Sequence, residues 1–132
     1  MSILEVPELL QLTALRTLCL HGNNIERIEG VQQLGGLQDL NLSSNCLTCV
    51  ENLGGLISLT SINLASNRLL DVSGLEGLHN LTHLNLSYNG ITSLSGLAAL
   101  HGPHCNLRIL DVRHNQARGN EAGDKKGVLA AI

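Results

Sequence analysis

The sequence predicts an α/β solenoid, a coil in which every turn adds one short strand to a parallel sheet. The sheet forms the concave face, and short helical or 3-10 turns form the convex side. Two observations predict this fold. Four segments with one shared pattern begin 22 residues apart, and their apolar and asparagine positions keep the same phase, which is typical of repeat architectures. These segments begin at Leu15, Leu37, Leu59 and Leu81.

A fifth segment breaks the even spacing. It reads "LRILDVRHNQA" and begins at Leu107, which is 26 residues after the fourth start rather than 22. Four residues are therefore inserted between Leu100 and Asn106. The pair Gly102-Pro103 is a turn signal, so we expect a longer loop on the outer side of the coil.

The apolar positions define the core. Within each L-x-L the two side chains are two residues apart, so they point to the same face of a short strand. No single repeat can bury these side chains alone, and stability therefore comes from stacking on neighbouring repeats. The first two columns are Leu18, Leu40, Ile62, Leu84 and Leu110, and Leu20, Leu42, Leu64, Leu86 and Val112.

One asparagine recurs after every predicted strand. We expect its side chain to lie inside the turn and to hydrogen-bond to loop backbone, which is a structural role. The pattern L-x-x-L-x-L-x-x-N-x-L at this period is the leucine-rich repeat signature. The ladder comprises Asn23, Asn45, Asn67, Asn89 and Asn115.

Length and composition limit the function classes. The 132 residues suffice for one domain, and the net charge of −3 gives no bulk attraction to nucleic acid or anionic membranes. The N-terminus "MSILEVPELL" has neither a basic segment nor a long apolar run. We therefore expect a cytoplasmic protein with no membrane partner, whose four cysteines are free thiols.

The chain divides into three parts. Residues 1–14 form a half repeat, residues 15–115 form the repeats, and residues 116–132 lose the apolar pattern and read as a disordered or loosely attached tail. Neither end carries a recognisable polar cap, which solenoids need for solubility. We therefore expect a piece of a longer protein that self-associates through its uncapped ends.

The concave face is the expected binding surface, because its side chains lie between the core leucines. Most are small and polar. Tyr88 is the only aromatic residue of the chain, and a modest basic corner lies near the last strand. The residues predicted to bind a protein partner are His83, Asn85, Tyr88, Arg108, Asp111, Arg113 and His114.

Catalysis and metal binding are not expected. Asp39, Ser61 and His83 fall on adjacent rungs, but serine is in the middle, whereas a triad needs histidine between serine and the acid. Cys46 and Cys49 form a C-x-x-C, which is only half of a zinc site. We predict no enzyme activity, no metal and no cofactor.

Two resemblances add to this reading. The uniform 22-residue length with "GLxxLxxL" resembles the leucine-rich repeats of a protein phosphatase 1 regulatory subunit and of tubulin-folding, ciliary and centrosomal proteins. The stretch "LNLSYNGITSLSGLAALHGPHCNLRILDVRHN" resembles the fourth-to-fifth repeat junction of the leucine-rich repeat and coiled-coil centrosomal family. That resemblance covers residues 15–115 and implies a centrosome-associated scaffold, although the coiled coil of that family is missing.

Several functions stay open at this stage. The preferred hypothesis is a non-catalytic protein-interaction scaffold from a centrosomal protein, and the alternative is a regulatory module that binds a protein phosphatase 1 catalytic subunit. One tyrosine and few acids on the face weaken the phosphatase hypothesis, because binding hot spots favour Trp, Tyr and Arg. A spliceosomal or tubulin-cofactor module and a bacterial adhesin are further possibilities.

Overall fold

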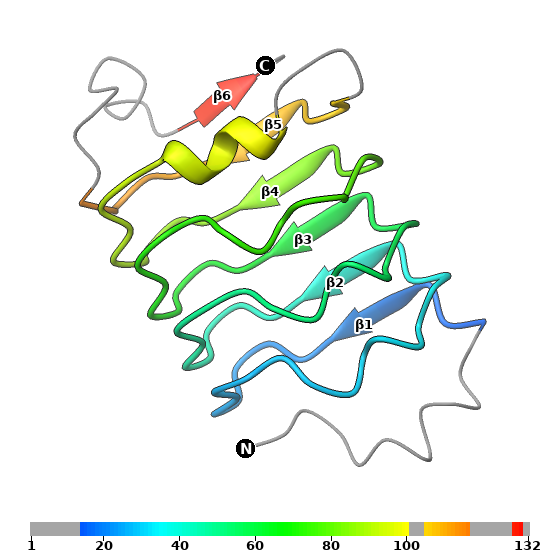
Figure 1. Cartoon of the computed structure of the whole chain (residues 1–132). Coiled ribbons are helices and arrows are strands. Elements are labelled where there is room, and N and C mark those ends of the chain that lie inside the picture. The colour runs from blue at the N-terminus through cyan, green and yellow to red at the C-terminus, as the bar shows by residue number, and fades with distance from the viewer. Residues whose placement is uncertain (1–13, 101–104, 117–127, 131–132) are drawn as a thin grey trace.

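The computed structural model describes residues 14–100, 105–116 and 128–130, and these residues form a solenoid (Figure 1). Its sheet has six strands in the order of the sequence. The first five pair in parallel, as predicted, and the sixth is antiparallel to the fifth. The strands are β1 (Thr17–Cys19), β2 (Asp39–Asn41), β3 (Ser61–Asn63), β4 (His83–Asn85), β5 (Ile109–Asp111) and β6 (Val128–Ala130).

The register of the sheet follows the repeat. Leu18 pairs with Leu40, and each further step along the sheet joins equivalent residues of neighbouring repeats. Leu84 pairs with Leu110, 26 residues later, so the four extra residues do not shift the sheet. The insertion itself covers residues 101–104, which lie outside the described part of the chain.

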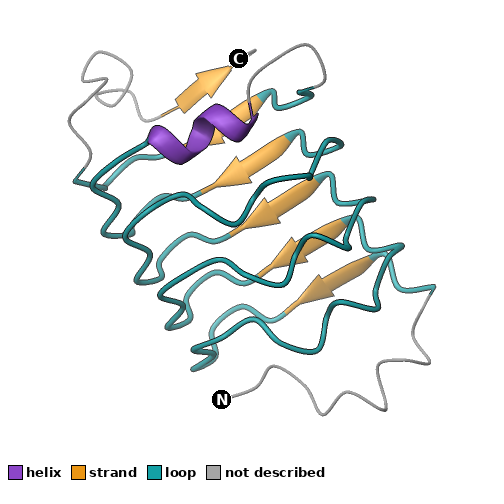
Figure 2. Cartoon of the chain, in the orientation of Figure 1, coloured by secondary structure: helices purple, strands orange, loops and turns teal. Residues whose placement is uncertain are grey.

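The core fills the space between the sheet and the returning loops, which Figure 2 shows as opposite sides of the coil. Leu40, Ile62, Leu84 and Leu110 of the strands are each at most 2% exposed. The first repeat is less complete, since Leu18 and Leu20 are only partly buried. The predicted core columns are therefore confirmed.

The convex side consists mainly of turns. One 3-10 helix, η2 (Ser95–Leu100), is the only helix in the described ranges, which contain no α-helix. Ala98-Ala99 of η2 corresponds to Glu76-Gly77 and Gly54-Gly55 in earlier repeats. Alanine favours helix and glycine disfavours it, but the first repeat has Gln32-Gln33 at these positions and forms only a turn, so residue type alone does not explain the helix of the fourth repeat. None of the helices described is long or apolar enough to span a membrane.

The two ends differ from the expectation in one respect. Residues 1–13 of the predicted half repeat lie outside the described part of the chain. In the predicted tail, β6 pairs with β5 through Ile109↔Ala130 and Asp111↔Val128, a strand that was not predicted. The outer edge of β5 is thus paired within the chain, whereas β1 has no strand on its other side in the described residues.

Candidate functional site on the concave face

The concave face carries the side chains that alternate with the core leucines. Its first column, Thr17, Asp39, Ser61, His83 and Ile109, runs in register across β1 to β5. Ser61 is partly buried and the other four are exposed. Ile109 is an apolar side chain with 43% of its surface exposed in a column that is otherwise polar. The β5 end of the column therefore offers apolar contact area to a partner.

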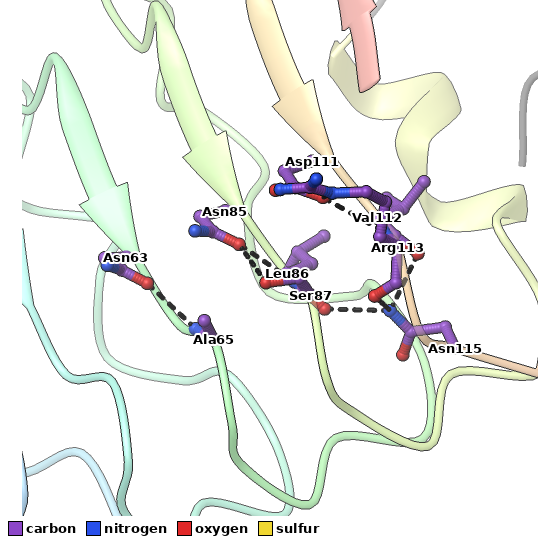
Figure 3. Close-up of polar contacts among 9 residues, drawn as sticks. All are labelled: Asn63, Ala65, Asn85, Leu86, Ser87, Asp111, Val112, Arg113 and Asn115. Atoms are coloured by element: carbon purple, nitrogen blue, oxygen red, sulfur yellow. Dashed lines mark hydrogen bonds and ion pairs between the residues drawn. The ribbon is translucent and has the colours of Figure 1, made fainter. Parts of the chain in front are cut away.

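The last residue of each of β2 to β5 closes a tight turn with its own side chain. The Oδ1 atoms of Asn41, Asn63 and Asn85 each accept the backbone N–H two residues later at 3.0 Å. Asp111 does the same at 3.0 Å (Figure 3). Such turns end a strand by giving the backbone a local hydrogen-bond partner. Asn85, a predicted binding residue, therefore has a structural role as well.

Asp111 and Arg113 form an ion pair on this face. Arg113 donates from Nε to Asp111 Oδ1 at 3.0 Å and from Nη2 to Oδ2 at 2.6 Å. Burial raises the pKa of Asp111, but the hydrogen bonds from Arg113 outweigh it, and the net pKa is lowered. The same bonds raise the pKa of Arg113. The predicted basic corner consists of Arg108, Arg113 and His114. The ion pair partly neutralises it, and Arg108 makes no ion pair within the described residues.

Tyr88 and His114 meet at the rim of the face. Their rings stack with centroids 4.2 Å apart and planes inclined by 16°. Both residues are exposed and both have left-handed backbone, with φ of 56° and 60°. Both are among the residues predicted to bind a partner, and the structure adds the stack and the strained backbone.

The tautomer of His83 follows from its neighbours. Thr82 Oγ1 donates its hydrogen to the carbonyl of Thr60 at 2.9 Å, so the 2.8 Å contact with His83 Nδ1 must be donated by the ring nitrogen. His83 thus carries a hydrogen on Nδ1, and its Nε2 is left for a partner. Ser61 on the neighbouring strand and Asp39 one strand further make no side-chain hydrogen bond to His83.

The asparagine ladder adopts the predicted arrangement. Asn67 Oδ1 accepts from the backbone N–H of Leu47 at 3.0 Å, and its Nδ2 donates to Leu42 O and Leu64 O at 3.0 and 3.1 Å. Asn45, Asn89 and Asn115 repeat this pattern with their own neighbours. Asn23 is exposed and donates only to carbonyls of its own turn. The ladder therefore joins adjacent repeats and is not a binding surface.

The cysteines are free thiols in the described structure. Cys49 donates to Glu51 at 3.3 Å, and burial together with that carboxylate raises its pKa. A raised pKa reduces the thiolate that metal binding requires. Across the described residues no three His, Cys, Asp or Glu side chains are close enough together to hold a metal ion.

Comparison with family models identifies the repeats. A model described as leucine-rich repeats in two copies matches residues 57–99 and 79–119, and a model described as a leucine-rich repeat matches residues 13–69. The chain belongs to the leucine-rich repeat family. The matched residues include β1 to β5, so the family covers the whole parallel sheet. No curated protein matches the chain at a significant level.

Solved structures place this leucine-rich repeat chain among varied relatives. It is 31% identical to a leucine-rich repeat protein of Leptospira interrogans, with a TM-score of 0.74 over 91% of this chain and 31% of that one. It is 28% identical to internalin C2 of Listeria monocytogenes, with a TM-score of 0.72 over 88% of this chain and 50% of that one. It is 30% identical to a chain of the Drosophila melanogaster SNF/U2A′ complex, with a TM-score of 0.67 over 80% of this chain and 63% of that one. The chain thus spans less than two thirds of each of these relatives.

Proposed function

We propose that the chain is a non-catalytic interaction module that binds a protein partner on its concave face. The observation that carries the proposal is the exposed Tyr88–His114 stack beside the ion pair of Asp111 and Arg113. Tyrosine and arginine are the residue types that most often dominate binding energy at protein interfaces. Exposed Ile109 adds apolar contact area at the same end of the sheet.

The backbone at the stack supports the same site. A bulky residue with positive φ costs on the order of 1–3 kcal/mol and persists where the surroundings hold it, often at ligand-binding positions. Tyr88 and His114 both have this conformation. Serine or glycine occupies the equivalent position in the first three repeats. The aromatic side chains are therefore not required by the fold, which favours a role in recognition.

A finer proposal concerns origin and location. The resemblance of the junction between β4 and β5 to centrosomal leucine-rich repeat proteins supports a scaffold fragment in the cytoplasm, at the centrosome or cytoskeleton. The uniform 22-residue period supports the alternative, a regulatory module for a protein phosphatase 1 catalytic subunit. The Drosophila relative comes from a complex, which supports a protein partner without distinguishing these two.

Site-specific photo-crosslinking in cells tests the proposed function. A crosslinking amino acid at Ser61, on the concave face, should capture a discrete protein, whereas the same group at Glu76, on the convex side, should not. The variant with Tyr88→Ala and Arg113→Ala should lose the adduct at Ser61 while its melting curve shows a folded solenoid. Adducts formed only from Glu76 would move the binding surface to the other side.

The identity of the captured protein tests the finer proposal. A centrosomal protein, together with a tagged chain that concentrates at the centrosome, supports the scaffold hypothesis. Capture of a phosphatase catalytic subunit supports the alternative. A tagged chain distributed evenly through the cytoplasm contradicts the centrosomal location but leaves the interaction module in place.

A further inference from the structure

Three carboxamide groups form an evenly spaced row on the concave face. Asn41, Asn63 and Asn85 are partners in register on β2, β3 and β4, so the groups repeat at the strand spacing of about 4.8 Å. We call these three side chains the amide row. All three are partly exposed, and their positions are fixed because each closes the turn that ends its strand.

Each member of the amide row uses its oxygen and leaves its nitrogen unused. Oδ1 accepts from the backbone two residues on, and in Asn41 and Asn85 also from a serine hydroxyl at 2.6 and 2.7 Å. No Nδ2 of the row donates to any residue in the described part of the chain. Figure 3 shows the nitrogens of Asn63 and Asn85 on the side away from these bonds. The row therefore presents hydrogen-bond donors outward.

The neighbouring groups make this part of the face poor in acceptors. On the next rung Asp111 is engaged by Arg113 through both carboxylate oxygens, and the guanidinium continues the line of donors. His83 Nε2 is the exception, because it carries no hydrogen in the Nδ1–H tautomer and accepts rather than donates, so the carboxylates of a partner are held by the amide nitrogens and not by this ring. Asp39 is the exposed carboxylate of the face and lies on β2, at the far end. A partner that presents carboxylates fits best across β3 to β5.

The spacing of the row indicates the form of the partner. Side chains three or four residues apart on an α-helix lie about 5–6 Å from one another, close to the strand spacing of about 4.8 Å. In an extended strand the side chains of one face repeat at about 6.6 Å, which fits less well. The small side chains of Ser61 and Ala65 beside the row leave room for a helix to approach.

We propose that the amide row binds an acidic α-helix of a protein partner, laid across β3 to β5 with its carboxylates on the Nδ2 groups and on Arg113. This inference rests on the proposed function and names the chemistry of its partner. A nucleic acid is a poorer match, because phosphate binding depends on neutralisation by Lys and Arg, and the row itself is uncharged.

The decisive variant is the double substitution Asn63→Asp and Asn85→Asp. It keeps the Oδ1 acceptor that closes each turn, as Asp111 already does at the equivalent position of β5, and it replaces each outward donor by a negative charge. The matched control is Asn24→Asp with Gln33→Glu. It makes the same change in net charge at two exposed residues outside the row.

The measurement is fluorescence anisotropy with labelled alanine-rich peptides of about 20 residues, long enough to form helix. The probe carries glutamates at positions i, i+4, i+7 and i+11. One comparison peptide has the same composition with the glutamates spread around the helix, and another has lysines in place of glutamates. A single-stranded RNA of ten uridines tests the nucleic-acid alternative.

The expected result is binding of the one-sided acidic peptide at least about tenfold tighter than either comparison peptide. The double aspartate variant should lose at least about tenfold in affinity, and the control should bind as the unmodified chain does. Equal binding by the lysine peptide, equal binding by the aspartate variant, or tighter binding of the RNA would each overturn the inference. The proposed function would survive these results if Ser61 still crosslinks to a protein.

Discussion

The phenol ring of Tyr88 lies on the imidazole ring of His114, 4.2 Å away between centroids. The two residues occupy the same position of neighbouring repeats, immediately before the asparagine ladder. Every repeat has left-handed backbone there, with φ between 56° and 75°. That position is filled by Gly22, Ser44, Ser66, Tyr88 and His114. The only aromatic residue of the chain thus stands where the coil needs a residue that tolerates positive φ.

Substitution of Tyr88 separates the cost of its backbone from the value of its ring. Tyr88→Gly and Tyr88→Ala both remove the stack with His114, but only alanine keeps the penalty for positive φ. We expect the glycine variant to be more stable than the alanine variant by about 1 kcal/mol, measured by denaturant unfolding. Both variants should lose partner binding equally. An alanine variant at least as stable as the glycine variant would contradict the strained backbone.

The asparagine ladder predicts a gradient of stability effects. Asn67→Ala leaves buried backbone groups of two neighbouring repeats unpaired, including the N–H of Leu47 and the carbonyl of Leu42. We expect a loss of about 1–3 kcal/mol in the free energy of unfolding. Asn23→Ala should cost much less, because Asn23 is exposed and bonds only within its turn. Equal losses at the two positions would contradict a role in joining repeats.

The sequence predicted the features that repeat in residue type. Columns such as Leu40, Ile62 and Leu84 share apolar chemistry and are buried. Each asparagine of the ladder has a side-chain amide that can hydrogen-bond to the backbone of two repeats. Such columns are visible without coordinates because one physical requirement selects one kind of side chain. The strand register followed from them directly.

Features set by backbone conformation could not be predicted from the sequence. The left-handed column contains glycine, serine, tyrosine and histidine, which share no side-chain property. The stack of Tyr88 on His114 joins two residues with left-handed backbone, and the spacing of the repeats does not predict that conformation. The pairing of Arg113 with Asp111 needs Arg113 to lie beyond the end of β5, where strand alternation no longer fixes direction. The sequence ends in "GVLAAI", a short apolar run after a glycine, and the interpretation of residues 116–132 as a tail overlooks this strand signal for β6.

The ion pair of Asp111 predicts a dependence of stability on pH. Its folded pKa is lowered by Arg113, so its stabilising contribution is present above the unfolded pKa of about 3.9 and is lost as pH falls through the folded value. Asp111→Asn keeps the turn acceptor, as Asn85 shows, but loses the charge. We expect it to cost less than about 1 kcal/mol at neutral pH, since Arg113 is exposed.

That cost should shrink as the solution is acidified below about pH 4. The measurement is the difference in the free energy of unfolding between the unmodified chain and Asp111→Asn at several pH values. Arg113→Gln provides a control, because it removes the other partner and should reduce the same pH dependence. A difference that grows as pH falls would contradict the lowered pKa of Asp111.

Gly74 marks a close approach between repeats. Its φ is 94°, and a Cβ there would lie 2.0 Å from the carbonyl oxygen of Val50. Asn52 occupies the equivalent position one repeat earlier with φ of 63°, and its Nδ2 donates to the carbonyl of Ile28 at 2.5 Å. The equivalent positions thus differ in backbone conformation, and asparagine is accommodated at one of them with a hydrogen bond to the preceding repeat.

The comparison of Gly74 with Asn52 predicts that the larger substitution at Gly74 costs less stability than the smaller one. Gly74→Ala should destabilise by about 2–5 kcal/mol, because it combines positive φ with a contact on rigid backbone. Gly74→Asn is larger but should cost less, since asparagine tolerates left-handed backbone and can donate to the Val50 carbonyl as Asn52 does to Ile28. Denaturant unfolding of both variants decides the point. If asparagine proved the worse of the two, steric volume rather than hydrogen bonding would govern this position, and Asn52→Gly should then stabilise the chain.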